Sequence, residues 1–299
     1  MWQQLLIGIK QGDQRSLARS ISCVENEVPG FEQFLAELPA GHASVTGITG
    51  PPGAGKSTLV DALIATWVLQ NKKVGVLCVD PSSPFNLGAV LGDRIRMSEW
   101  YNHPNVFIRS LATRGSLGGL HPHIIDITAL MQAAGFDHII VETVGVGQSE
   151  IEIAGLADTT IVVVVPEAGD EVQTMKAGLM EIADIFVVNK SDRPDADHFV
   201  KNLRLMLAPT FNQTQWQVPI IKTIASTRTG IDELVKAIEE HALLQQTRPR
   251  KAWLLAERAY QLIQREKMRG VKKSAIKDAI ETNLAKGEFN LFTFIQQYL

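Results

Sequence analysis

The residues most clearly suited to chemistry in this chain form a glycine-rich run that ends in a lysine and a serine. Residues 50–57 read Gly-Pro-Pro-Gly-Ala-Gly-Lys-Ser, a full match to the phosphate-binding P-loop pattern. Glycines in such a loop let backbone N–H groups turn toward a phosphate, and the helix that follows adds the positive end of its dipole. Lys56 would reach the β- and γ-phosphates of a nucleotide, and the Ser57 hydroxyl would bind the Mg²⁺ that neutralises their charge. The nucleotide contacts predicted in this loop are Gly50, Gly53, Ala54, Gly55, Lys56, Ser57 and Thr58.

The segments on either side of the run supply the strand and the helix that a P-loop requires. Residues 45–49 are rich in β-formers, and apolar residues recur at helical spacing from Leu59 to Trp67. A chance glycine-rich turn, the alternative, would not need this order of strand, loop and helix. We therefore expect an anion-binding loop at the start of a helix.

A second motif, Asn189-Lys190-Ser191-Asp192, matches the Asn-Lys-x-Asp signature that reads guanine. It follows the apolar run 185–188, and open α/β sheets bind their ligands at the carboxyl ends of such strands. The Asp192 carboxylate could accept hydrogen bonds from N1–H and the 2-amino group of guanine, whereas adenine offers no matching pair of donors. A helix-capping Asn beside a surface Lys and Asp is the alternative. Together with the P-loop upstream, the motif predicts a GTPase.

Hydrolysis of the γ-phosphate requires an acidic side chain near Mg²⁺ and a backbone N–H that senses the phosphate. The apolar run 138–142 ends in Glu142 and is followed by Thr-Val-Gly, which gives the pattern Glu-x-x-Gly. We expect Glu142 to reach Mg²⁺ through water and the N–H of Gly145 to contact the γ-phosphate. The loop 143–150 should then become ordered with GTP and relax after hydrolysis. An ordinary glutamate at a strand end is the alternative.

Two aspartates complete the predicted metal and water site. Asp80 follows the apolar run 74–79, on the strand expected directly after the P-loop helix, where it could orient the attacking water or a Mg²⁺-bound water. Asp93 could join the metal shell when its loop closes. Turn or helix-capping roles are the alternative for both residues. The predicted metal ligands are thus Ser57, Asp80, Asp93 and Glu142, and the predicted catalytic residues are Lys56, Asp80 and Glu142.

Composition argues against several classes of protein. The chain has 299 residues, 45% of them hydrophobic and 20% charged, with a formal net charge of −3, which is typical of a soluble globular protein. No apolar run approaches the roughly 20 residues of a membrane-spanning helix, and residues 1–6 lack the features of a secretory signal, so we expect a cytoplasmic protein without a membrane partner. The lack of a long basic stripe argues against a nucleic-acid partner. Cys23 and Cys78, predicted to be buried thiols, and the seven scattered histidines show no metal-ligand spacing.

Apolar runs alternate with helical patterns through the middle of the chain, which predicts an α/β fold of the P-loop NTPase type. The expected sheet is mainly parallel, with helices on both faces. After the first strand, the expected strands are residues 74–79, 105–109, 138–142, 160–165, 185–188 and 218–224. We expect an N-terminal segment with two helical patterns (1–40), a G domain (41–244) and a C-terminal helical extension (245–299). Helical patterns of the extension span 252–268, 273–285 and 290–298, and their apolar face needs a cover from its own G domain, a second copy or a partner.

Taken in order, these blocks resemble the MeaB/ArgK family of P-loop G proteins, which act as chaperones for adenosylcobalamin-dependent acyl-CoA mutases. The resemblance covers roughly residues 40 to 240. Its most specific stretch is Val-Glu-Thr-Val-Gly-Val-Gly-Gln-Ser-Glu at 141–150. The supporting blocks are 80–83, 91–93, 115–119 and 168–176.

The resemblance implies functions that the P-loop alone does not. In the family, the block at 168–176 is a third switch through which the mutase accelerates GTP hydrolysis and GTP controls cofactor loading. Carried over, the candidate coupling residues are Gln148, Asp170, Gln173 and Lys176. The resemblance further implies slow intrinsic GTPase activity with Mg²⁺ as cofactor, and a homodimer made by the helical extension. It also implies gated delivery of adenosylcobalamin, or removal of damaged cobalamin, at a partner mutase, with no cobalamin bound by this chain itself.

Some residues depart from the family pattern. Where relatives carry a Ser-Ala pair that supports the guanine, this chain has Ile224-Ala225, so the Ala225 N–H can face the base oxygen without a hydroxyl beside it. The first-switch segment reads Phe-Asn-Leu-Gly-Ala-Val at 85–90 and Arg-Ile-Arg at 94–96, where relatives carry Gly-Gly and Lys-Thr-Arg. An acyl-CoA mutase other than methylmalonyl-CoA mutase stays open as the partner.

Two other enzyme classes share the P-loop and remain as alternatives. A P-loop kinase should provide a basic lid and an acceptor site, and the sequence shows no cluster of arginines for such a lid. A nickel-insertion maturation GTPase should carry a His-rich or Cys-based metal site, which the sequence does not show. Transfer of the γ-phosphate to a protein would favour the kinase, and tight stoichiometric Ni²⁺ binding would favour the maturation GTPase.

Overall fold

The computed structural model describes residues 1–80, 97–113, 120–143, 149–168, 177–207, 216–244, 249–287 and 289–298. It divides into two compact units, Met1–Lys251 and Ala252–Leu299. Within the described residues, no helix combines the length and the apolar character that crossing a membrane requires.

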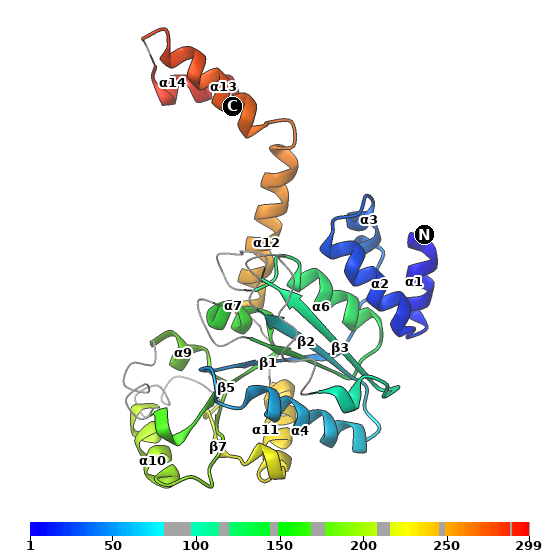
Figure 1. The fold of residues 1–299 in the computed structure, drawn as a ribbon, viewed down its shortest axis with the longest axis vertical. Coiled ribbons are helices and arrows are strands. Elements are labelled where there is room, and N and C mark those ends of the chain that lie inside the picture. The colour runs from blue at the N-terminus through cyan, green and yellow to red at the C-terminus, as the bar shows by residue number, and fades with distance from the viewer. Residues whose placement is uncertain are drawn as a thin grey trace. The chain divides into compact units, whose positions relative to one another are not determined.

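The first unit is built around a seven-stranded sheet in the order β3-β2-β4-β1-β5-β6-β7, and every pairing between neighbouring strands is parallel (Figure 1). The strands are β1 (Ser44–Thr49), β2 (Val74–Asp80), β3 (Val106–Ala112), β4 (His138–Glu142), β5 (Thr159–Val164), β6 (Ile185–Val188) and β7 (Ile220–Lys222). Each expected strand is present, and each of its ends lies within three residues of the expected position. β7 is shorter than the run 218–224 that predicted it. The α/β fold with a parallel sheet is thereby confirmed.

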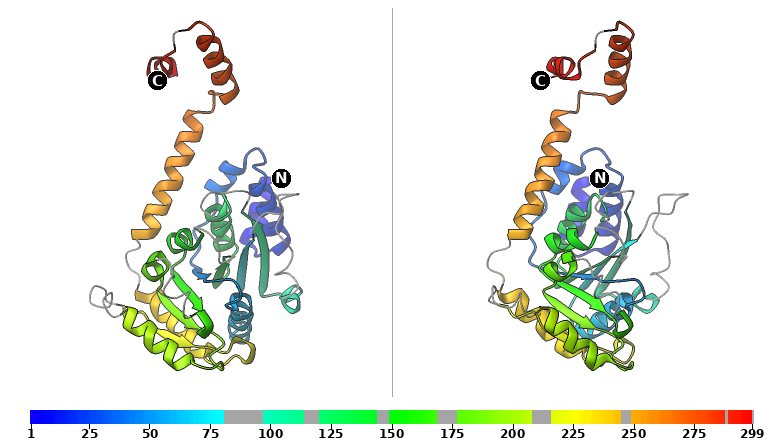
Figure 2. Two further views of the ribbon diagram at one scale, coloured as in Figure 1. Left: turned by 60° about the vertical axis from the view of Figure 1, so that its left-hand side comes forward. Right: turned by 90° about the vertical axis from the view of Figure 1, so that its left-hand side faces the viewer.

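Helices cover both faces of this sheet, as the views in Figures 1 and 2 show. On one face, α4 (Lys56–Leu69) and α11 (Ile231–Leu244) bury their apolar side chains in a common core with the strands. On the other, α7 (Ser149–Leu156), α9 (Ala177–Ile182) and α10 (Ala196–Leu207) share a second core with β5 and β6. All six residues of β5 are buried, because a strand covered on both sides has no solvent face.

The strand register places the ends of the strands at one edge of the sheet. Ile48 of β1 lies opposite Glu142 of β4, and Thr49 lies opposite Val162 of β5. The chain moves from β1 to one side of the sheet for β2 and β3, and to the other side for β5, β6 and β7. The carboxyl end of β1 is therefore a topological switch point, the position where open parallel sheets bind ligands.

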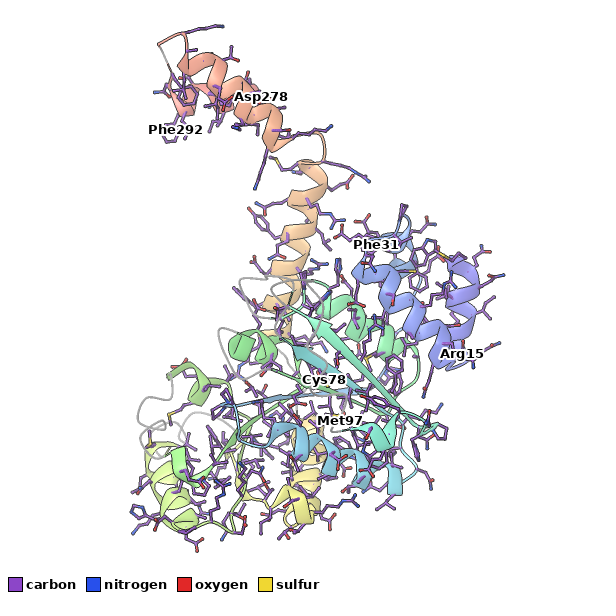
Figure 3. All side chains as sticks on the ribbon, in the orientation of Figure 1. Arg15, Phe31, Cys78, Met97, Asp278 and Phe292 are labelled. Carbon is purple, nitrogen blue, oxygen red and sulfur yellow. The ribbon has the colours of Figure 1, made fainter. Side chains whose placement is uncertain are left out.

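The N-terminal segment forms three helices rather than the two predicted: α1 (Trp2–Lys10), α2 (Gln14–Glu25) and α3 (Phe31–Ala36). The third has six residues, too few for a helical period to stand out in the sequence. Two of these helices, α1 and α2, contact α6 (Ile124–Ala133). Cys78 is buried in β2, within the side chains that fill the sheet region of Figure 3, whereas Cys23 of α2 is only partly buried, so the prediction of a buried thiol was wrong for Cys23.

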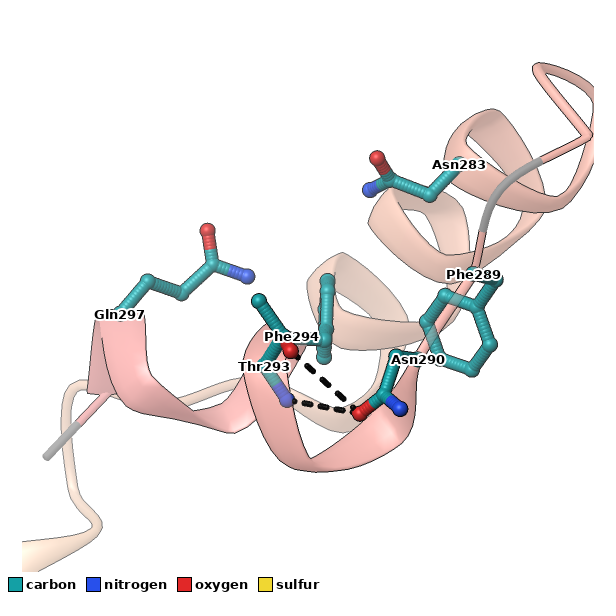
Figure 4. Close-up of a pocket in the computed structure, with 6 residues that line it drawn as sticks. All are labelled: Asn283, Phe289, Asn290, Thr293, Phe294 and Gln297. Carbon is teal, nitrogen blue, oxygen red and sulfur yellow. Dashed lines mark hydrogen bonds between the residues drawn. The ribbon is translucent and has the colours of Figure 1, made fainter.

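The second unit is helical, as its sequence pattern predicts. Its helices are α12 (Pro249–Lys267), which begins in the first unit, α13 (Lys273–Leu284) and α14 (Leu291–Ile295), followed by a 3₁₀ turn, Gln296–Tyr298. The Asn290 side chain caps α14 by accepting hydrogen bonds from the Thr293 N–H (3.0 Å) and hydroxyl (3.4 Å), at the edge of a small hollow (Figure 4). The hollow is lined by Asn283, Phe289, Asn290, Thr293, Phe294 and Gln297. No described side chain from Ala252 onward is buried.

Candidate phosphate and base site

The P-loop joins β1 to α4 at the switch point of the sheet, and two of its glycines are required by close contacts. Gly50 has φ 140°, and a Cβ there would lie 2.1 Å from the Val163 carbonyl oxygen of β5. Gly55 has φ 87°, and a Cβ there would lie 2.4 Å from the Asn189 amide nitrogen. Any other residue would meet both a left-handed backbone and a steric clash. The sheet on one side and Asn189 on the other therefore determine the path of the loop.

Lys56 is held inside this loop. Its Nζ donates to the carbonyl oxygens of Gly50 (2.8 Å) and Pro51 (3.0 Å), and the residue is 7% exposed. A buried ammonium group requires such oxygen partners, and phosphate oxygens are stronger acceptors than carbonyls because they carry charge. Lys56 is also the first residue of α4, whose N-terminus adds positive potential. The loop is therefore suited to bind an anion.

Ser57 and Glu142 meet beside the loop. The Ser57 hydroxyl donates to Glu142 Oε1 at 2.8 Å, and both side chains are buried. They come together because β1 pairs with β4, so that the strand leading into the P-loop runs beside the strand that ends in Glu142. A hydroxyl and a carboxylate are hard oxygen ligands, of the kind that hold Mg²⁺ together with substrate phosphates. The residues present fit the predicted metal.

The base side of the site is organised by Asn189, which is 2% exposed. Its amide nitrogen donates to the Ala54 carbonyl of the P-loop at 2.9 Å. Its Oδ1 accepts from the Thr223 hydroxyl and from the Ala225 N–H, each at 3.1 Å. One side chain thus joins the phosphate loop to the loop after β7, which sequence reasoning did not foresee.

Lys190 and Asp192 flank this junction. Lys190 Nζ donates to the Gly53 carbonyl at 2.7 Å, and its backbone has φ 56°, in the left-handed region. Asp192 is exposed at the same end of the sheet. The Ala225 N–H, predicted from the sequence to face the base oxygen, donates to Asn189 Oδ1 in this structure. A base oxygen would have to share that N–H or replace the asparagine.

An ion pair joins the loop that follows Asp192 to the short turn that follows β5. Arg193 donates to the Glu167 carboxylate, which lies in the 3₁₀ turn Pro166–Ala168. Slight burial raises the pKa of Glu167, but hydrogen bonds and the Arg193 charge outweigh it and hold that pKa below its usual range. Both side chains are about half exposed, so the pair contributes little to stability.

Several predicted site residues lie outside the described part of the chain, and their roles stay predictions. The predicted residues entirely outside the described ranges are Asp93, Gly145, Gln148, Asp170, Gln173 and Lys176. Asp80 ends β2, paired with Ala112 of β3, so its backbone lies at the same sheet edge as Glu142, but the structure does not describe its side chain. Thr58, by contrast, is described and lies exposed on the first turn of α4. Among the described residues, no group of three or more His, Cys, Asp or Glu side chains is placed to hold a metal ion.

Several proteins are similar in sequence to almost the whole chain, and a solved structure has a similar fold. The model of a family described as "Methylmalonyl Co-A mutase-associated GTPase MeaB" matches residues 17–282. A putative GTPase of Pyrococcus abyssi (strain GE5 / Orsay) is 45% identical over 294 residues, covering 97% of this chain and 89% of its own. GTPase ArgK of Escherichia coli (strain K12) is 32% identical over 296 residues, covering 95% and 86%. A crystal structure described as an LAO/AO transport system kinase has a TM-score of 0.69 and 26% identity, with 99% of this chain and 96% of that chain covered.

Proposed function

The chain belongs to the MeaB family of GTPases, and we propose that its GTP turnover controls the loading and repair of an adenosylcobalamin-dependent acyl-CoA mutase. The observation that carries the nucleotide part is the junction at Asn189. This side chain binds both the P-loop and the loop after β7, which supports a single site built from the two motifs predicted to read phosphate and base. The mutase part rests on the family description and on the sequence blocks 141–150 and 168–176.

On the phosphate side, we assign binding and catalysis to residues of the P-loop and the ends of β2 and β4. Lys56 Nζ would exchange the Gly50 and Pro51 carbonyls for the β- and γ-phosphates. Ser57 would hold Mg²⁺ directly and Glu142 through water, and the ion would neutralise the phosphate charge. Asp80 would orient the attacking water or a Mg²⁺-bound water, and Asp93 would join the metal shell when its loop closes. The N–H of Gly145 would bind the γ-phosphate.

On the base side, we assign guanine selection to Asp192. Its exposed carboxylate can accept from N1–H and the 2-amino group, while Lys190 and Asn189 stay bound to the P-loop carbonyls. Adenine would leave this carboxylate without its two donors, and unpaired polar groups are what reject a wrong base.

Coupling to a partner is assigned to Gln148, Asp170, Gln173 and Lys176, and the cobalamin would stay on the partner. The C-terminal extension, residues 245–299, would form a homodimer. Its described side chains include large exposed apolar residues and none that is buried, so a stable fold for it requires a cover.

The nucleotide part is tested by steady-state hydrolysis of GTP by the purified protein, with ATP as the competing substrate. We expect kcat/KM for GTP to exceed that for ATP by at least about 100-fold, since each unmade pair of base contacts is costly. Lys56→Ala should abolish turnover. The matched control is Lys236→Ala, because the Lys236 side chain is 77% exposed on α11. Equal use of ATP and GTP would contradict the assignment of Asp192.

The same reaction separates hydrolysis from phosphoryl transfer. The similar crystal structure described as a kinase makes this distinction necessary. With GTP labelled at the γ-phosphate, a GTPase releases the label as inorganic phosphate. Label on this protein or on an added protein acceptor would instead favour the kinase alternative.

A further inference from the structure

Two buried threonine hydroxyls meet where β1 and β4 end. The Thr143 hydroxyl donates to Thr49 Oγ1 at 2.9 Å, and the two residues are 2% and 0% exposed. The Thr143 N–H also donates to the Ile48 carbonyl at 3.0 Å. The strand register explains the meeting, because Ile48 lies opposite Glu142 and each of these two residues is followed by a threonine.

The position of this pair in the chain links it to the site. Thr49 directly precedes Gly50 of the P-loop, and Thr143 directly follows Glu142. The pairing of β1 with β4 ends at Ile48 and Glu142, so the hydroxyl bond continues the connection one residue beyond the last paired residues. Glu142 is therefore held on two sides, by Ser57 at its carboxylate and by Thr143 along its backbone.

We propose that the Thr49–Thr143 hydroxyl bond is a positioning contact that keeps the Glu142 carboxylate at a fixed distance from Ser57 during GTP turnover. The proposal rests on the function proposed above, because it matters only if Ser57 and Glu142 share one Mg²⁺. Loop 143–150 is expected to change with the nucleotide, and its first residue is the one that is bonded. The bond would hold Glu142 in place while the loop that starts at Thr143 responds to the nucleotide.

Thr143 could also be needed only for packing, and a static structure does not separate that role from the positioning of Glu142. The two roles differ in whether the hydroxyl is required. Thr143→Val keeps the shape and the methyl group but removes the donor, whereas Thr143→Ser keeps the donor and removes the methyl group. If the hydroxyl positions Glu142, valine is damaging and serine restores function. If packing matters, serine is the worse replacement, because it leaves a cavity.

The test measures kcat, KM for GTP and the Mg²⁺ concentration that gives half-maximal hydrolysis. For Thr143→Val we expect kcat to fall about tenfold and the Mg²⁺ requirement to rise about fivefold, since small displacements of a ligand are costly to catalysis. KM for GTP should change less than about threefold, because the phosphate and base contacts lie on other residues. Thr49→Val and the double variant should show the same loss as Thr143→Val, since all three remove one bond. Thr143→Ser should recover most of kcat.

Thr128→Val is the matched control. Thr128 is also buried, and its hydroxyl donates to the Ile124 carbonyl within α6, away from the site. It should lose stability without a change in Mg²⁺ requirement. Additive losses in the double Thr49 and Thr143 variant, or a serine variant as impaired as the valine variant, would overturn the proposal.

A second readout needs no hydrolysis. In the nucleotide-free protein, amide hydrogen exchange of residues 139–143 should speed up in Thr143→Val and stay at the wild-type rate in Thr143→Ser. If the wild-type protein did not hydrolyse GTP, the proposed function would fail, and the positioning contact would still be judged by this exchange and by the Mg²⁺ dependence of GDP binding. Unchanged exchange in Thr143→Val would overturn the positioning contact alone.

Discussion

Asn189 shows how a single side chain can carry the connection between two distant motifs. Its side-chain amide makes three hydrogen bonds, with the Ala54 carbonyl, the Thr223 hydroxyl and the Ala225 N–H. Because these partners are buried, losing the amide would leave several polar groups without hydrogen bonds, each at a cost of about 1–3 kcal/mol. Asn189 therefore holds the P-loop in place, in addition to the base-binding role that we propose for its motif.

The close approach of Asn189 to Gly55 gives a prediction at the residue scale. Gly55→Ala places a Cβ 2.4 Å from the Asn189 amide nitrogen in a backbone with φ 87°, so we expect the free energy of unfolding to fall by about 2–4 kcal/mol. Gly53→Ala is the matched control, since Gly53 has φ 78° but no atom within 4 Å of the added Cβ. It should cost only the backbone term, about 1–2 kcal/mol. Urea unfolding of the nucleotide-free proteins measures both, and equal losses would show that the contact with Asn189 does not matter.

Among the elements, β4 carries a functional candidate at one end and an aromatic contact at the other. Its carboxyl end carries Glu142, and its first residue, His138, stacks on Trp67 of α4 with ring centroids 4.2 Å apart and planes 8° from parallel. The Ser44 hydroxyl lies 3.2 Å from His138 Nδ1 across the β1–β4 pair. Burial lowers the pKa of His138 to about 4, with Lys72 lowering it further and Asp137 opposing. The ring is therefore neutral in the folded protein near neutral pH.

This shift predicts a loss of stability in acid. Because the folded pKa lies below the unfolded value of 6.5, the unfolded chain takes up the proton first as the pH falls. The stability contributed by neutral His138 is complete above about pH 6.5 and is lost as the pH falls toward 4. Allowing for partial exposure, we expect a contribution of about 2 kcal/mol between about pH 7 and about pH 4.5.

His138→Phe isolates this contribution, since phenylalanine can stack on Trp67 and does not titrate. Urea unfolding of both proteins at the two pH values should show a loss that is about 2 kcal/mol larger in the wild type. Equal losses in wild type and variant would exclude His138 as the source of the acid sensitivity.

The elements were predictable from the sequence where their signal is local, and the contacts between them were not. The run at 160–165 predicted a strand, observed at Thr159–Val164, because a strand buried on both faces is apolar almost throughout. The order of the strands, by contrast, depends on pairing between segments far apart in the chain, which no apolar run encodes. The same distinction holds in the site: the P-loop and the guanine motif are local patterns, whereas the Thr49–Thr143 contact depends on the register of β1 with β4.

At the scale of the whole molecule, the two units differ in how they bury apolar surface. The first has continuous cores on both faces of its sheet, whereas the second, from Ala252 onward, exposes Trp253 (70%), Tyr260 (58%) and Phe292 (75%). Figure 3 labels Phe292 on this unit. A helical segment of this length that buries none of its described side chains is not stable by itself, which is the physical basis for the proposed homodimer.

The dimer gives a prediction that light scattering after size-exclusion chromatography can check. The wild-type protein should have the mass of two chains, and a variant with Trp253→Ser and Phe292→Ser should shift toward one. Leu69→Ser is the control, because Leu69 is 79% exposed at the end of α4 in the first unit. A wild-type protein that stays monomeric at every concentration, or a double variant that remains dimeric, would contradict a homodimer through this extension.

The proposed function requires that a partner mutase accelerates GTP turnover by this protein. GTP hydrolysis is followed with the protein alone and with each of a panel of purified adenosylcobalamin-dependent acyl-CoA mutases. We predict that one mutase accelerates turnover by at least about tenfold, a lowering of the barrier by about 1.4 kcal/mol. Lys176→Ala should lose the acceleration while GDP affinity is kept, and Lys201→Ala, at an exposed lysine of α10, should keep both. Turnover that no mutase changes would contradict the claim.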